Sequence, residues 1–200
     1  MVIFRFLVLI FSAILHEVAH GYTAYKLGDD TALRMGRITL NPLSHLDPIG
    51  SLFLPLILYL TSGGSFIFGW AKPVPYNPLK LKDIRRDSAI LAFAGPLVNL
   101  LLALVFGILI RLIVYFNFYP LVPLFSIVVG INLMLAVFNL IPLPPLDGSK
   151  IFFYLFPSQR IEMFLNRYSF LLLFIVLIWG WNVIFPIVKF LFFIITGLPL

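Results

Sequence analysis

Long runs of apolar residues dominate this 200-residue chain, and they limit it to folds in which lipid replaces water as the solvent. Hydrophobic residues make up 62% of the sequence and charged residues 11%, whereas a soluble domain has about 45–50% apolar and about 25% charged residues. Charges this sparse cannot cover a water-facing surface, so the chain is predicted to be an integral membrane protein. Its length is typical of one domain, and residues 1–200 are taken as a single membrane domain.

The apolar runs divide the chain into membrane segments joined by polar loops. We predict an all-α polytopic membrane protein with about four to six membrane segments. These segments are expected at residues 2–27, 49–70, 88–116, 121–141 and 170–198. Gly180 and Pro186 interrupt the last one, which is expected to be one helix with a broken continuation.

The composition excludes several kinds of site. The chain has no cysteine, which excludes disulfides, thiolate zinc sites, iron–sulfur clusters and cysteine nucleophiles. The side chains left for chemistry are few: three histidines, His16, His20 and His45, and two glutamates, Glu17 and Glu162. The net charge of +6 is interpreted as cytoplasmic loops and lipid headgroup contacts, and no nucleic acid partner is expected.

The motif that most directly indicates chemistry is His16-Glu17-Val18-Ala19-His20, inside the first apolar segment. Residues four apart share one face of a helix, so both imidazoles can reach one ion. Zinc accepts imidazole nitrogens, and a neighbouring glutamate can take a proton from water, as in the zinc-metalloprotease helix. The alternative is a histidine pair with a salt-bridging glutamate. Ionisable residues within a membrane helix are costly and usually functional, which favours the metal site.

Catalytic zinc usually has three protein ligands, so a further ligand is expected. His45 lies in a turn-rich loop and is interpreted as a surface or interfacial residue. Glu162 lies in a charged loop and is interpreted as solvated. Asp147, which follows the fourth segment and precedes Gly148, could be a turn residue or a helix N-cap. An oxygen ligand is what the histidine pair lacks, however, and this favours Asp147.

Two motifs in this order, the histidine motif and Asn139-Leu-Ile-Pro-Leu-Pro-Pro-Leu-Asp147-Gly148, resemble the site-2 protease family of intramembrane zinc metalloproteases, peptidase family M50. The similarity extends over nearly the whole chain and includes Asn41–Gly50, Gly69–Pro75 and Ala94–Asn99. These stretches look like the compact prokaryotic branch without a PDZ domain. Substrate selection is then expected to rest on the membrane core or on a separate partner. Asn99 is interpreted as a packing residue.

The resemblance implies a zinc metalloendopeptidase that hydrolyses peptide bonds in or near transmembrane segments of membrane-protein substrates, as in regulated intramembrane proteolysis. It implies one Zn²⁺ ion per chain, bound by His16, His20 and Asp147. Glu17 would be the general base and afterwards the acid that protonates the leaving amine. Asn139 would position water or stabilise the oxyanion.

Two other functions use a similar set of residues. A metal transporter could also place histidines and an aspartate in a membrane, but it would not need Glu17 and would usually show an internal repeat. A non-catalytic membrane chaperone is expected to have lost a ligand or the base. The protease is therefore favoured, and its expected partners are the lipid bilayer and a membrane protein with a transmembrane segment.

The ligands must lie at one depth in the membrane. Along a helix that rises about 1.5 Å per residue, His20 is about 10 Å from Leu27 and about 27 Å from Val2. The site therefore lies near the end of the first segment, and Asp147 lies just beyond the end of the fourth, so these two ends face the same side. The loops there are basic, which predicts that this side is cytoplasmic and that the N-terminus is outside.

The fourth segment can end on the cytoplasmic side only if the third segment starts there. The segment at 49–70, which lies between the first and the third, must therefore start and end on the cytoplasmic side. We predict a re-entrant, β-hairpin-like element between the first and second core helices. It would contain a short helix to about Leu60, a turn at Gly63-Gly64 and an extended return through Lys72-Pro73-Val74-Pro75. An extended return could pair with an unwound substrate by strand addition.

Overall fold

The computed structural model describes residues 1–61 and 72–200, and within these two ranges the chain is helical, with no strand. The α-helices are α1 (Val2–Lys26), α2 (Thr31–Arg34), α3 (Leu54–Thr61), α4 (Ile84–Tyr115), α5 (Val122–Asn139), α6 (Asp147–Leu155), α7 (Gln159–Arg167), α8 (Ser169–Trp179) and α9 (Trp181–Thr196). Short turns of 3-10 or π-helix lie between them: η1 (Pro42–His45), η2 (Pro48–Phe53), η3 (Pro78–Lys80) and η4 (Tyr119–Leu121).

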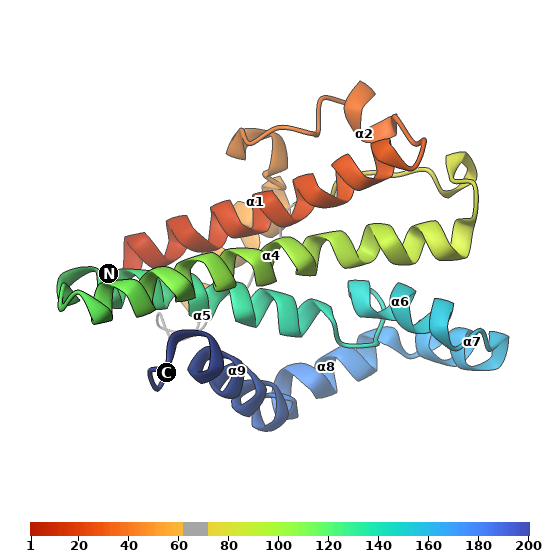
Figure 1. The fold of residues 1–200 in the computed structure, drawn as a ribbon. Helices are drawn as coiled ribbons and strands as arrows, with labels where there is room; N and C mark the ends of the chain where they lie inside the picture. The colour runs from red at the N-terminus through yellow and green to blue at the C-terminus, as the bar shows by residue number, and fades with distance from the viewer. Residues whose placement is uncertain (62–71) are drawn as a thin grey trace.

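The long helices α1, α4 and α5 pack against one another as a bundle (Figure 1). Their outer faces carry exposed apolar side chains, such as Ile3 and Leu101, as expected for surfaces that contact lipid chains. Three described helical stretches are long and apolar enough to cross a membrane: Val2–Lys26, Ile84–Tyr115 and Tyr119–Asn139. A fourth is counted if α7 and α8, which meet at 69°, form one span. The prediction of an all-α, multi-pass membrane protein is confirmed.

The apolar core lies where α9 packs on α4 and α5. Its buried members are Ala103, Ile110, Val129, Leu133, Ile184, Val188 and Phe192. Gly107 allows the close approach of α9, because a Cβ there would lie 2.0 Å from Cγ2 of Ile195; small residues serve this purpose in membrane helix pairs. Arg111 donates hydrogen bonds to the carbonyls of Ile194 and Ile195 and so fastens the end of α9 to α4.

The ends of α1 and α5 and the start of α4 lie at one end of the bundle (Figure 1). Gly28, whose φ is +107°, follows α1 and turns the chain out of the helix. The loop after α1 is then fastened to the loop before α4. Lys80 Nζ lies 2.6 Å from Asp30 Oδ1, and the backbone N–H of Asn77 donates to Asp29 Oδ2. The polypeptide between these loops therefore starts and ends at the same end of the bundle.

The predicted re-entrant element at 49–70 is only partly described. Helix α3 begins at Leu54 and ends at Thr61, and the backbone N–H of Lys72 donates a 2.8 Å hydrogen bond to the carbonyl of His45. The two flanks of the element thus meet. The predicted turn at Gly63-Gly64 and the return to residue 71 lie outside the described residues, and residues 72–77 have no regular secondary structure.

The C-terminal third differs from expectation in two places. The loop predicted after residue 141 contains α6 and α7, which are helices of nine residues without the continuous apolar run that indicates a membrane segment. The last segment breaks at Gly180, as predicted, between α8 and α9. Pro186, however, lies inside α9; a membrane helix tolerates proline when neighbouring groups satisfy the freed carbonyl.

Candidate metal centre

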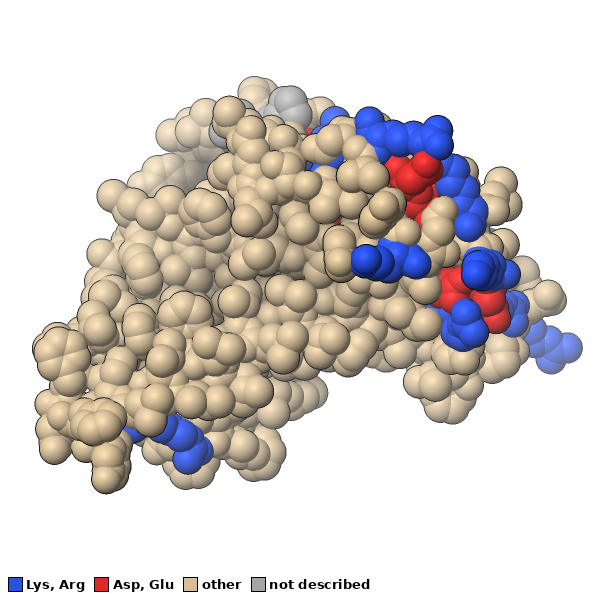
Figure 2. Space-filling view, turned by 45° about the horizontal axis from the view of Figure 1, so that its top comes forward, with Lys and Arg blue, Asp and Glu red and all other residues tan. Residues whose placement is uncertain are grey.

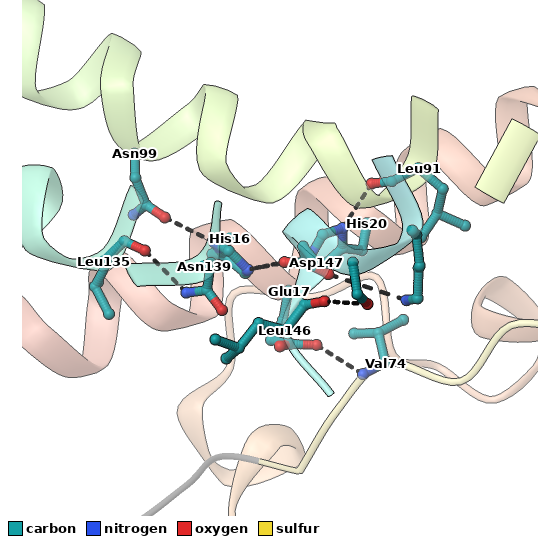
Figure 3. A network of polar contacts seen from close by, with 12 residues as sticks. His16, Glu17, His20, Val74, Leu91, Asn99, Leu135, Asn139, Leu146 and Asp147 are labelled. Carbon is teal, nitrogen blue, oxygen red and sulfur yellow. Dashed lines mark hydrogen bonds and ion pairs between the residues drawn. The ribbon is translucent and has the colours of Figure 1, made fainter. Parts of the chain in front are cut away.

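His16 and His20 lie on one face of α1, with both side chains buried in the bundle (Figure 3). Their Nε2 atoms are 3.0 Å apart, and their rings meet edge to face. The four-residue spacing therefore brings two ring nitrogens to one point, as the periodicity of a helix predicts.

Asp147 is the first residue of α6, directly after the N-cap Leu146, so it is not the N-cap itself. Its Oδ2 lies 3.1 Å from Nε2 of His16 and 3.1 Å from Nε2 of His20. Gly148 allows the start of α6 to pack closely against the end of α5, because a Cβ at residue 148 would lie 2.2 Å from the carbonyl oxygen of Leu140. Burial acts to raise the pKa of Asp147, but hydrogen bonds to the two imidazoles outweigh it, and the pKa lies below its ordinary range.

This donor set fits a zinc ion. Two imidazole nitrogens and a carboxylate oxygen are common zinc ligands, and a tetrahedral ion with ligand bonds of about 2.0–2.1 Å separates neighbouring donors by about 3.3 Å. The observed separations of 3.0, 3.1 and 3.1 Å are close to this value. Gly95 of α4 faces the same point: a Cβ there would lie 2.5 Å from Nε2 of His16 and 2.6 Å from Nε2 of His20.

Each donor residue is held by a second contact on its outer side. His16 Nδ1 lies 2.7 Å from Asn99 Oδ1, and His20 Nδ1 lies 2.7 Å from the carbonyl oxygen of Leu91. Lys150 Nζ lies 4.0 Å from Oδ1 of Asp147. Such outer partners orient metal ligands and fix the imidazole tautomer.

Glu17 lies beside the histidines on α1, and its Oε2 accepts a 2.8 Å hydrogen bond from the backbone N–H of Val74 (Figure 3). It lines a cavity of about 220 Å³ together with the three donor residues and part of the 72–77 segment. The cavity is lined by His16, Glu17, His20, Pro73, Val74, Tyr76, Leu91, Asn139, Pro145, Leu146, Asp147 and Lys150. A carboxylate in this cavity can exchange a proton with water or an amine at the site.

Asn139, predicted to be catalytic, is the last residue of α5 and lines the same cavity. One N–H of its amide donates a 2.9 Å hydrogen bond to the carbonyl of Leu135, which orients the side chain. The predicted role is compatible with this position in the cavity and stays a prediction.

For three residues, the location or contacts in the structure differ from those inferred from the sequence. His45 is buried, with 2% of its surface exposed, and its Nε2 donates to the carbonyl of Thr39; it is not a surface residue. Glu162 lies on α7, not in a loop. Asn99 is not only a packing residue, because it binds His16. A polar residue inside an apolar helix is the signal that could have indicated this contact.

Comparisons with known proteins agree on one family. Residues 116–176 match the sequence profile of Peptidase family M50. The relatives named "Putative zinc metalloprotease" include YwhC of Bacillus subtilis (strain 168), 45% identical over 150 residues and 72% of this chain, and Rip2 of Mycobacterium tuberculosis (strain H37Rv), 33% identical over 141 residues and 68% of this chain. Zinc metalloprotease MJ0392 of Methanocaldococcus jannaschii is 29% identical over 147 residues, or 73% of this chain.

The chain spans only part of these relatives: 64% of the length of YwhC, 51% of Rip2 and 32% of MJ0392. No solved structure shows a significant match to the chain.

Proposed function

Because this chain belongs to peptidase family M50, we propose that it is a zinc metalloendopeptidase that hydrolyses peptide bonds in or beside transmembrane segments of membrane proteins. The main support for this proposal is that two imidazoles, one carboxylate and Glu17 all line one cavity inside a membrane bundle. Neither a structural ion pair nor a simple metal store needs a glutamate in that position.

His16, His20 and Asp147 would hold the zinc ion through Nε2, Nε2 and Oδ2. Zinc bound in such a site acts as a Lewis acid that polarises a carbonyl and activates water. The charge of Asp147 offsets part of the charge of the ion, and the hydrogen bonds to Asn99 and to the Leu91 carbonyl keep the imidazoles turned toward it.

Glu17 would take the proton from the attacking water and pass it to the leaving amine nitrogen. The Val74 N–H holds its Oε2, which leaves Oε1 for this proton. Asn139 would donate its second amide N–H to the oxygen of the scissile carbonyl as negative charge develops there.

The substrate would reach this cavity with its scissile segment unwound, since the carbonyls of an intact helix are bonded within the helix. Residues 72–77 run along the cavity without regular secondary structure, and Pro73, Val74 and Tyr76 line it. The N–H groups of Lys72, Val74 and Asn77 are already bonded within the protein. We propose that the carbonyl groups of this segment accept hydrogen bonds from the unwound substrate, as in strand addition. The expected partners are therefore a membrane-spanning substrate and the surrounding lipid.

The active site would lie near the cytoplasmic side, with the N-terminus outside. In Figure 2, most lysine and arginine side chains gather with the acidic residues at one end of the molecule, and one basic group lies at the opposite end. The loop before α4 carries Lys72, Lys80 and Lys82 and lies at the end where α1 finishes. The site is nearer this end, because His20 precedes the end of α1 at Lys26 by about 9 Å of helix. Basic residues mark the cytoplasmic side of membrane proteins.

The orientation can be tested with single cysteines, since the native chain has none. Cysteines at the exposed positions Lys82 and Arg160 are expected to react with an impermeant maleimide only from the cytoplasmic side. A cysteine at Asn117, between α4 and α5, is expected to react only from outside. Labelling of all three positions from one side would refute the assigned topology.

The proteolytic activity is tested with purified protein and a membrane-spanning reporter in detergent or liposomes. Glu17→Gln is expected to lower the cleavage rate by about 10²–10⁴-fold, the usual contribution of a general base. Glu162→Gln makes the same chemical change on α7 and is expected to cleave like the native protein. Full cleavage by Glu17→Gln would remove Glu17 from the mechanism, and no cleavage of any reporter by the native protein would count against the protease.

A further inference from the structure

A buried chain of amide groups connects the candidate metal centre to the middle of the helix bundle. Asn99 of α4 and Asn132 of α5 are both fully buried. Asn99 Nδ2 donates to Asn132 Oδ1 at 2.9 Å, and Asn132 Nδ2 donates to Ser12 Oγ of α1 at 2.9 Å. Together with the contact between Asn99 and His16, these bonds join α1, α4 and α5 through polar side chains in a membrane.

The direction in which these amide groups donate hydrogen bonds is set at Asn132, the amide farther from His16. Asn132 Nδ2 also lies 2.9 Å from the backbone carbonyl oxygen of Val128, which can only accept a hydrogen bond. The amide nitrogen of Asn132 must therefore face Val128, and its oxygen must face Asn99. The carbonyl of Ser12, 3.4 Å from Asn99 Nδ2, requires the same orientation of Asn99.

The orientation of Asn99 then decides the protonation of His16. With its nitrogen turned toward Asn132, Asn99 presents Oδ1 to His16 Nδ1 at 2.7 Å. Asp147 Oδ2, 3.1 Å from Nε2, also accepts, so in metal-free protein it competes for the ring proton of a neutral His16, whereas the carboxamide oxygen of Asn99 holds that proton at Nδ1. Nε2 is then unprotonated, and its lone pair is available at the point where the donors converge.

We propose that Asn132 and Asn99 are positioning residues that hold His16 in the Nδ1–H tautomer and so prepare Nε2 for the metal ion. The inference rests on the proposed zinc site. Asn132 has hydrogen bonds to Asn99, Ser12 and Val128 and none to His16, His20 or Asp147 among the bonds of the described residues. It acts on the ligand only through Asn99.

His20 provides an internal control, because its Nδ1 faces the backbone carbonyl of Leu91, 2.7 Å away. A main-chain acceptor also requires the Nδ1–H tautomer, and no side-chain substitution removes it. Loss of the Asn99 or Asn132 amide is therefore expected to let His16 adopt both neutral tautomers and to leave the tautomer of His20 unchanged.

The test uses ¹⁵N NMR of the histidine rings in metal-free protein that carries Asp147→Ala, which removes the competing acceptor at Nε2, at about pH 9, well above the ordinary imidazole pKa of about 6.5. The chain has three histidines, so each is assigned by removing one at a time. Ring nitrogens with and without a proton have distinct chemical shifts. The Asp147→Ala protein is expected to show His16 and His20 protonated at Nδ1.

Three variants decide between a positioning and a merely structural role. Added to Asp147→Ala, Asn99→Leu and Asn132→Leu are expected to give mixed tautomers at His16, with His20 unchanged as proof of an intact fold. Asn99→Asp keeps an acceptor oxygen and is expected to retain the Nδ1 proton of His16. His16 protonated at Nε2 in the Asp147→Ala protein, or an unchanged His16 signal after Asn132→Leu is added to it, would overturn the proposal.

Zinc affinity gives a second readout that needs no proteolysis. In competition with a chelator, Asn99→Leu and Asn132→Leu are expected to bind zinc about 10–100-fold more weakly, the usual effect of losing an outer partner of a metal-binding histidine. Asn182→Leu makes the same change at an exposed position of α9 and is expected to bind like the native protein. Native affinity in Asn132→Leu would contradict the proposal, whether or not the protein proves to be a protease.

Discussion

The backbone N–H of Val74 donates a 2.8 Å hydrogen bond to Oε2 of Glu17, which lies 57 residues earlier in the chain. Pro73 and Pro75 flank this donor and disfavour helix, which leaves the amide of Val74 free to bond outside its own segment. The neighbouring amide of Lys72 is bonded to the carbonyl of His45. The extended segment thus holds the candidate base through its main chain.

Replacing Val74 with proline removes this hydrogen bond and tests whether it orients Glu17. Hydrogen bonds to charged groups contribute about 1.5–3 kcal/mol, so kcat is expected to fall by about tenfold or more. Val74→Ala retains the N–H and is the control, since both variants lose the packing of the valine side chain against Gly21. Equal kcat values for the two variants in the reporter assay would show that the bond does not matter.

Gly95 is expected to be essential for metal binding, because the space of its missing side chain is occupied by the two imidazoles. A Cβ at this position would lie 2.5 Å from His16 Nε2, so Gly95→Ala must displace the ligand atoms. We expect the variant to lose bound zinc and activity. Gly130→Ala is the matched control on α5, where the nearest atom to the new Cβ is 3.5 Å away. Native zinc content in Gly95→Ala would contradict the observed geometry.

The sequence was sufficient to predict which side chains the structure brings together, His16, His20 and Asp147. A four-residue spacing in a helix and the cost of ionisable groups in lipid both act locally, so His16 and His20 could be found from a short stretch. The contact of Asn99 with His16 could not be predicted, because it spans 83 residues and depends on which face of α4 turns toward α1. The hydrogen bond from Val74 to Glu17 could not be predicted for a further reason. Its donor is a main-chain N–H, and the residue types in a sequence do not indicate which main-chain groups bind side chains.

The helix boundaries show a similar division between local and non-local causes. The apolar run predicted the second core helix from residue 88, whereas α4 begins at Ile84. Asp83 explains the difference, because its side chain accepts a hydrogen bond from the backbone N–H of Arg86 and caps the helix. The charged residues that looked like a loop form its first turn. Hydropathy locates the part of a helix that lies in lipid, and capping determines where it starts.

Acid is expected to weaken the contact between the loops at the basic end. Asp29 is fully buried, and burial acts to raise its pKa; hydrogen bonds from Thr31 and Asn77 and the charge of Lys80 outweigh this, and the pKa is lowered. A carboxyl with a lowered folded pKa stabilises the fold above its unfolded pKa of 3.8, and this stabilisation is lost as the pH falls through the folded value.

Thermal unfolding of the detergent-solubilised protein measures this effect. The Tm of native protein is expected to fall as the pH drops below about 5. Asp29→Asn is expected to have a lower Tm at neutral pH and a shallower fall in acid. Lys80→Met removes one contribution to the lowered pKa of Asp29 and also the ion pair with Asp30, so only its loss of Tm in acid is compared, and this loss is expected to be intermediate. An Asp29→Asn variant with the native Tm at neutral pH and the native loss in acid would show that this carboxylate does not contribute.

Elemental analysis of purified variants tests most directly whether His16, His20 and Asp147 bind one zinc ion. Native protein and Glu17→Gln are expected to contain about one zinc ion per chain, because Glu17 is not a ligand. His16→Ala, His20→Ala and Asp147→Ala are expected to contain almost none after the same purification. Zinc retained by Asp147→Ala at the native level, or absent from native protein supplied with zinc, would contradict the account.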